Sequence, residues 1–80
     1  MQSNINISKD ARTFAEIWQN LSANDKSILR QRLMAGMDIT RQTVDNWSKG
    51  KAPKYLDVKK RAAQIVSRTL GISCSWNTLF

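Results

Sequence analysis

The sequence predicts a small all-α domain of four to five helices, and three observations support this prediction. Apolar residues recur three and four positions apart in successive segments, which is the spacing of one helix face. No segment keeps the alternation of apolar and polar residues that is typical of a half-buried strand. Glycine follows three of the helical segments, at Gly36, Gly50 and Gly71, where it commonly ends a helix. A chain of 80 residues is expected to form one domain with a small core.

The first predicted helix begins near Asp10 and has an apolar face directed at the core. Residues 1–8 precede it, and we expect them to be flexible because chain ends without apolar contacts are seldom ordered. The apolar face of this helix consists of Phe14, Ile17, Trp18 and Leu21.

A second helix is predicted from Ser22 to about Ala35. Ser22 and Asp25 have the spacing of a capping box, although Asp reaches back less well than the usual Glu. Gly36 is expected to end this helix, and residues 36–39 to connect it to the next one. Its apolar side consists of Ile28, Leu29 and Leu33.

The third predicted helix lies between Thr40 and Gly50. Thr40 can act as the N-cap, and Gly50 can adopt the left-handed conformation that ends a helix. Val44 and Trp47 are three positions apart, so they share one face and are expected to pack on the core. The other sides carry polar residues, namely Arg41, Gln42, Asp45, Asn46 and Lys49.

A basic loop follows, in which Pro53 cannot continue a helix, and the last long helix is predicted to begin at Leu56 or Asp57. Gly71 is expected to end it. The apolar positions of this helix are Val58, Ala62, Ile65, Val66 and Leu70.

Residues 73–80 form a C-terminal tail that contains Trp76, Leu79 and Phe80. Because these side chains are costly to leave in water, we expect them to pack on the core or to lie at a dimer interface, with packing within the chain favoured. We expect Cys74 to be packed in the interior or to have no chemical role, and not to be catalytic.

The chain has a formal net charge of +7, from 13 Lys and Arg residues against 6 Asp and Glu residues. Such an excess indicates an anionic partner, although it can also serve solubility or attract acidic lipid. No segment pairs its lysines with the broad apolar face of a membrane-surface helix. Seven of the basic residues fall between positions 41 and 61, namely Arg41, Lys49, Lys51, Lys54, Lys59, Lys60 and Arg61.

Several classes of function are disfavoured by the composition. The chain has no histidine and a single cysteine, so the commonest general base and a cysteine cluster for metal binding are both missing. We therefore expect no catalytic site, no metal and no cofactor, and no small-molecule substrate is evident. The apolar runs are too short to cross a bilayer, and the first residues lack the pattern of a secretory signal. A cytoplasmic location is expected.

Residues 40–53 resemble the helix-turn-helix of the phage repressor and Cro family, often called Xre-like. The family pattern has a Ser or Thr cap, a small polar residue, an aliphatic residue, a Trp or Leu, and then Gly-Lys with a nearby Pro. The matching positions are Thr40, Thr43, Val44, Trp47, Gly50, Lys51 and Pro53.

The resemblance implies a helix-turn-helix DNA-binding domain over residues 9–72 and assigns roles to individual residues. The bases of double-stranded DNA would be read by Arg41, Gln42 and Asn46. The phosphates would be contacted by Thr43, Lys49, Lys51 and Lys54, and the reading helix would be supported by Thr40, Val44, Trp47 and Gly50.

The chain departs from the family upstream of this stretch. The predicted connection, residues 36–39, is about two residues longer than the family's usual turn. The family also has a glutamine at the start of the supporting helix, and Lys26, Arg30 or Arg32 could take its place here.

The leading hypothesis is a sequence-specific regulator of transcription, in which the 41–49 helix enters the major groove of DNA. Such proteins commonly act as homodimers, and the tail or the last long helix is the candidate interface. The alternative is a protein-interaction module, for example an antitoxin or adaptor, in which Trp47 or the aromatic tail holds a protein partner. Binding of single-stranded nucleic acid is disfavoured because no strand carries stacking aromatics.

Overall fold

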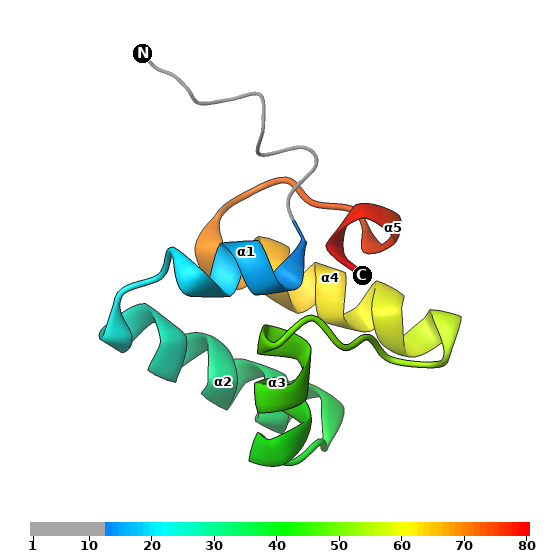
Figure 1. Ribbon diagram of the computed structural model, residues 1–80, viewed down its shortest axis with the longest axis horizontal. Coiled ribbons are helices and arrows are strands. Elements are labelled where there is room, and N and C mark those ends of the chain that lie inside the picture. Colours follow the sequence, from blue (N-terminus) through cyan, green and yellow to red (C-terminus); the bar gives the residue numbers. More distant parts are fainter. Residues whose placement is uncertain (1–12) are drawn as a thin grey trace.

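The computed structural model describes residues 13–80, and this range contains five helices and no strand. The predicted all-α fold is therefore confirmed for these residues. The helices follow one another around a shared centre (Figure 1). Their bounds are α1 Phe14–Gln19, α2 Ala23–Met37, α3 Arg41–Ser48, α4 Leu56–Leu70 and α5 Trp76–Leu79.

The helix α1 begins at Phe14 because Thr13 caps it. The Thr13 hydroxyl accepts a hydrogen bond from the Glu16 backbone N–H at 3.3 Å, and the Glu16 carboxylate accepts one from the Thr13 N–H at 3.0 Å. This pair is a complete capping box, which the sequence interpretation overlooked. The predicted start near Asp10 and the predicted flexible residues 1–8 lie outside the described residues.

The predicted end of α2 at Gly36 is wrong. The helix continues through Gly36 to Met37, and it ends at Asp38, which has the left-handed φ of 55° and ψ of 44°. Gly36 is exposed within the helix, and a Cβ atom on this residue would lie 2.9 Å from the Cδ1 atom at the end of the Ile65 side chain on α4. A larger residue at this position would therefore require the end of the Ile65 side chain to shift.

The connection from α2 to α3 is consequently shorter than predicted. It consists of residues 38–40, because α2 ends at Met37 and α3 begins at Arg41. Ile39 in this connection packs against the core. A three-residue link places α3 directly beside the end of α2, and α3 runs across that end rather than alongside it (Figure 1).

The predicted limits of α3 and α4 agree closely with the structure. Thr40 caps α3, and Gly50 has a φ of 103° just after it. The Lys51 N–H donates to the Asn46 carbonyl and the Gly50 N–H to the Trp47 carbonyl, which is the Schellman pattern of helix termination. Gly71, with a φ of 67°, ends α4.

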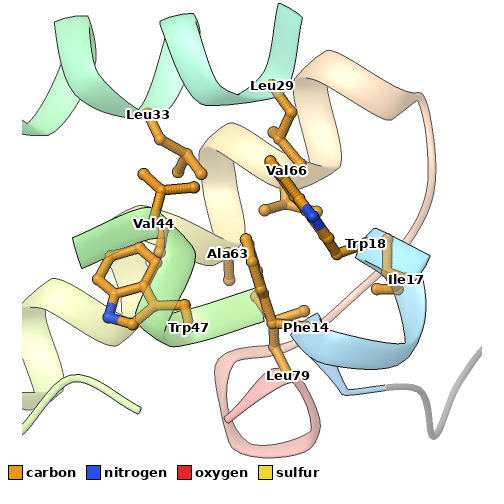
Figure 2. Close-up of a cluster of buried hydrophobic side chains, with 11 residues drawn as sticks. Phe14, Ile17, Trp18, Leu29, Leu33, Val44, Trp47, Ala63, Val66 and Leu79 are labelled. Atoms are coloured by element: carbon orange, nitrogen blue, oxygen red, sulfur yellow. The ribbon is translucent and has the colours of Figure 1, made fainter. Parts of the chain in front are cut away.

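One apolar core connects all five helices (Figure 2). Phe14 lies near its middle and packs on three other aromatic rings, those of Trp18, Trp47 and Phe80, with centroid distances of 5.8, 5.9 and 5.8 Å. The tail therefore packs within the chain, since Leu79 is 1 % exposed and Phe80 stacks on Phe14. The eleven buried residues are Phe14, Ile17, Trp18, Leu29, Leu33, Val44, Trp47, Ala62, Ala63, Val66 and Leu79.

Within residues 13–80, no helix combines the length and the apolar composition needed to span a bilayer.

Candidate functional site

The helix α3 is held to the domain by its inner face. Val44 is fully buried and points toward Leu33 of α2 (Figure 2). Trp47 is 4 % exposed and makes edge contacts with Phe14, at 5.9 Å, and with Phe80, at 5.3 Å. Because α3 is anchored at both residues, its outer face has a defined direction relative to the rest of the molecule.

The start of α3 is held by hydrogen bonds between two threonines. The Thr40 hydroxyl accepts from the Thr43 backbone N–H at 3.2 Å, and the two hydroxyl oxygens lie 3.1 Å apart. The hydroxyl of Thr43, a residue predicted to lie near a phosphate, is therefore also a neighbour of the cap. This arrangement orients the first turn of α3, where Arg41 and Gln42 are exposed.

The outer face of α3 carries a hydrogen-bonded pair of amide side chains. The Gln42 Nε2 atom donates to the Asn46 Oδ1 atom at 3.1 Å, across one helical turn. This bond leaves the Gln42 carbonyl oxygen as an acceptor and the Asn46 amide as a donor. Three predicted base-reading residues, Arg41, Gln42 and Asn46, thus occur on one short helix, and two of them are in direct contact.

Basic side chains lie at the end of α3 and on the loop that follows it. Lys49 is the C-cap residue, and Lys51 and Lys54 are exposed on the loop. Asp45 is half-buried on α3 and is the acidic residue within this stretch. The net charge of the stretch is positive.

A further basic residue is held close to the core on α2. The guanidinium carbon of Arg30 lies 5.4 Å from the centre of the Trp18 ring, and the buried Nε atom of Arg30 has no hydrogen-bond partner. The position of the Arg30 side chain is thus constrained by its contact with Trp18. The spacing of apolar residues predicted only that Trp18 packs in the core, so the contact between Arg30 and Trp18 could not be predicted from the sequence.

Two exposed apolar residues at the start of α4 were not singled out by the sequence analysis. Tyr55 is 69 % exposed and Leu56 is 47 % exposed, directly after the basic loop. Their position just before the predicted apolar face of α4 is the only signal in the sequence that could have drawn attention to them.

No protein-family model matches this chain, and no significant match occurs among curated proteins or solved structures.

Proposed function

We propose that this protein is a sequence-specific double-stranded DNA-binding regulator, in which α2, the link at residues 38–40 and α3 act as a helix-turn-helix of the phage repressor type. The observation that carries the proposal is the geometry of α3. Its inner face is fixed by Val44 and Trp47, while its outer face presents Arg41 and the Gln42–Asn46 pair. A helix with this division of faces suits the major groove, which is wide enough to admit it.

The length of the link supports this proposal. Helix-turn-helix motifs join their two helices by a turn of about three or four residues. The three residues 38–40 agree with that length. Counted without the cap Thr40, as in the predicted connection 36–39, the link consists of Asp38 and Ile39 and is two residues shorter than predicted.

The side chains on α3 have the chemistry of base recognition. Arginine can donate two hydrogen bonds to the O6 and N7 atoms of guanine. Adenine presents a donor and an acceptor in the major groove, and the Gln42 carbonyl together with the Asn46 amide provides the complementary acceptor and donor. Asp45 could accept from cytosine.

The phosphates are assigned to the basic residues around α3. Lys49, Lys51 and Lys54 extend from the end of α3 and its loop, and Arg30 on α2 adds a partly exposed positive charge, although its Nε atom is buried. With about five phosphates contacted, the logarithm of the binding constant should fall with the logarithm of salt concentration at a slope of about −4 to −5.

A homodimer would match the two-fold symmetry of paired half-sites. Leu79 and Phe80 belong to the core, so the tail is a poor interface candidate. We assign the interface instead to Tyr55 and Leu56, which are exposed beside the basic loop. A regulator of this kind would act in the cytoplasm.

The alternative function is a protein-interaction module, in which Trp47 or the aromatic tail would contact the protein partner. Trp47 and Leu79 are both buried, so of these residues a protein partner can reach only the half-buried Trp76 and Phe80.

Selection of bound sequences from random duplex DNA tests the proposal, with Arg41→Ala and Lys54→Ala compared with the unchanged protein. Arg41→Ala should lose about 1–3 kcal/mol of preference at one base pair, because a bidentate contact disappears. Lys54→Ala should weaken binding uniformly and reduce the salt slope by about 1. Arg61→Ala, which removes an exposed charge from α4, is the matched control and should leave the preferred sequence unchanged. Selection that returns no preferred sequence would contradict the proposal.

A further inference from the structure

A hollow of about 390 Å³ lies between α4 and the C-terminal segment. None of its lining residues belongs to α3 or to the basic loop. The two surfaces are built on different contacts, because α3 packs on α1 and α2 whereas α4 packs on α2 and α5. The hollow is therefore a second candidate surface, and its use does not depend on what α3 binds.

The lining of the hollow combines apolar residues, which we call its floor, and basic residues, which we call its rim, with the polar Gln64, Ser67 and Ser75. The floor includes Ala63, the half-buried Cys74, whose Sγ atom lies 3.5 Å from the Ala63 carbonyl oxygen, and the half-buried ring of Trp76. Lys60 and Arg68 are exposed eight positions apart on α4, so they lie on one face of this helix and flank the hollow. A ligand that fits must supply apolar surface in the middle and negative charge at the edges.

The positive charge continues around α4. A second hollow of about 250 Å³, against Gly36 and Ile65, shares Gln64 and Arg68 with the first one and adds Arg61. Asp57, at the start of α4, is the one acidic residue of this helix, against the basic residues Lys59, Lys60, Arg61 and Arg68. The outer side of α4 therefore attracts anionic groups.

We propose that this surface docks an acidic segment of a partner protein, which inserts an apolar side chain between Ala63 and Trp76 and places carboxylates beside Lys60 and Arg68. Tryptophan and arginine, here the half-buried Trp76 and the exposed Arg68, are among the residue types that most often dominate the binding energy of protein interfaces. Duplex DNA fits less well, because its phosphate backbone has no apolar group to cover the floor of the hollow.

Charge also argues against the other occupants. A second copy of the chain, with 13 basic residues against 6 acidic ones that are scattered singly, offers no acidic segment to this surface. The chain's own residues 1–12 contain two basic residues and one acidic residue, so they offer no excess of negative charge. An acidic segment from another protein is the occupant whose charge complements the rim.

Selection from a displayed library of random 12-residue peptides tests this inference, with the full-length protein as the target. We expect enrichment of peptides in which Asp or Glu flank a large apolar residue. An enriched peptide, synthesised with a fluorescent label, should bind the Lys60→Glu/Arg68→Glu variant about tenfold more weakly or worse, since two attractive contacts become repulsive. Both residues are exposed on the outside of α4, so the variant should keep its fold, which the helical circular dichroism and thermal unfolding check.

The matched control is Arg32→Glu/Lys54→Glu, which changes the net charge equally at exposed positions outside the hollow. It should bind the labelled peptide within about twofold of the unchanged protein, apart from the long-range charge effect that salt screens. Equal losses in both variants would show that only net charge matters and would overturn the inference. A selection without acidic–apolar enrichment would also overturn it.

A duplex titration distinguishes this inference from DNA binding. Lys60→Glu/Arg68→Glu should retain the sequence preference that Arg41→Ala loses. If the variant instead fails to bind duplex DNA and no peptide is enriched, the outer side of α4 is a nucleic-acid surface and the inference fails. If the protein selects no DNA sequence, the proposed function is contradicted. The peptide selection still tests the docking surface on α4, because it does not use DNA.

Discussion

At the residue scale, glycines that look alike in the sequence have different roles. Gly50 and Gly71 have φ values of 103° and 67°, which residues with a side chain rarely adopt. A Cβ atom on either glycine would meet nothing within 4 Å. Gly36 lies inside a helix, and its missing side chain makes room for Ile65. The backbone conformation therefore favours glycine at positions 50 and 71. At position 36 it is the contact with Ile65 that a side chain would disturb.

Gly36→Leu should be less stable than Ala35→Leu by about 1 kcal/mol, because the added side chain has to displace the end of the Ile65 side chain. The better helix propensity of Leu, worth about 1 kcal/mol over Gly, offsets part of the cost. Urea denaturation monitored by tryptophan fluorescence measures the change. Ala35→Leu is the control, since Ala35 is an exposed neighbour on the same helix and should tolerate the larger side chain within about 0.5 kcal/mol. Equal stability of the two variants would contradict a steric contact between position 36 and Ile65.

The thiol of Cys74 provides a pH-dependent prediction. Partial burial raises the pKa of this thiol, and the hydrogen bond with Ser67 lowers it by less. Since the thiolate is the reactive form, a thiol-reactive disulfide reagent at neutral pH should modify the folded protein more slowly than the urea-unfolded protein. Because the pKa is higher in the folded state, the contribution of Cys74 to stability is fully present at neutral pH. It should decline only as the pH rises above the ordinary pKa of cysteine.

The Cys74→Ser variant is the control for this decline, because its stability should not show the same alkaline change. Identical pH dependence of the free energy of unfolding in both proteins would contradict the assignment to Cys74. Equal modification rates of the folded and unfolded protein would contradict its partial burial.

At the element scale, α3 depends on its ends as well as on its packing. It has only eight residues, which is too short for a helix to be stable alone in water. Thr40 satisfies one free N–H group at its start, and the Schellman hydrogen bonds at Lys51 and Gly50 satisfy carbonyls at its end. The direction of its outer face therefore depends on its terminal residues as well as on the buried Val44 and Trp47.

Thr40→Ala should cost about 0.5–2 kcal/mol of stability, because the Thr43 N–H loses its capping partner. Thermal or urea unfolding measures the loss. Thr40→Ser keeps a hydroxyl at the same position and should recover most of the stability. If serine restores nothing, the threonine methyl group, and not the cap, contributes the stability.

At the scale of the whole molecule, the short helix α5 completes the core. Leu79 is 1 % exposed, and Phe80 contacts both Phe14 and Trp47. The C-terminal residues thus support α1 and α3 together. A chain of this size has little apolar surface to spare, so the last two residues matter for the stability of the entire domain.

Leu79→Ala should cost about 2–5 kcal/mol, since it leaves a cavity among fully buried side chains. Because α3 rests on the same core, tryptophan fluorescence should report one cooperative transition at a lower urea concentration. Asn77→Ala, at an exposed position of the same helix, should change stability by less than about 0.5 kcal/mol. A separate early transition confined to α5 would contradict its place in the common core.

The sequence alone determined the all-α class, the cap of α3 at Thr40, the limits of α4 and the buried pair Val44 and Trp47. These features depend on neighbours within about one helical turn, so local spacing and capping chemistry are sufficient to predict them.

Only the tertiary structure decided the role of Gly36, the length of the link between α2 and α3, the stacking of Arg30 on Trp18 and the hollow beside Trp76. The length of the link depends on the left-handed conformation of Asp38, and the other three depend on residues from different segments of the chain. Gly36 and Ile65 meet because α2 packs on α4, and Arg30 and Trp18 meet because α1 packs near α2. Such contacts leave no periodic signal in a single sequence, because the distance along the chain says nothing about which helix faces will meet.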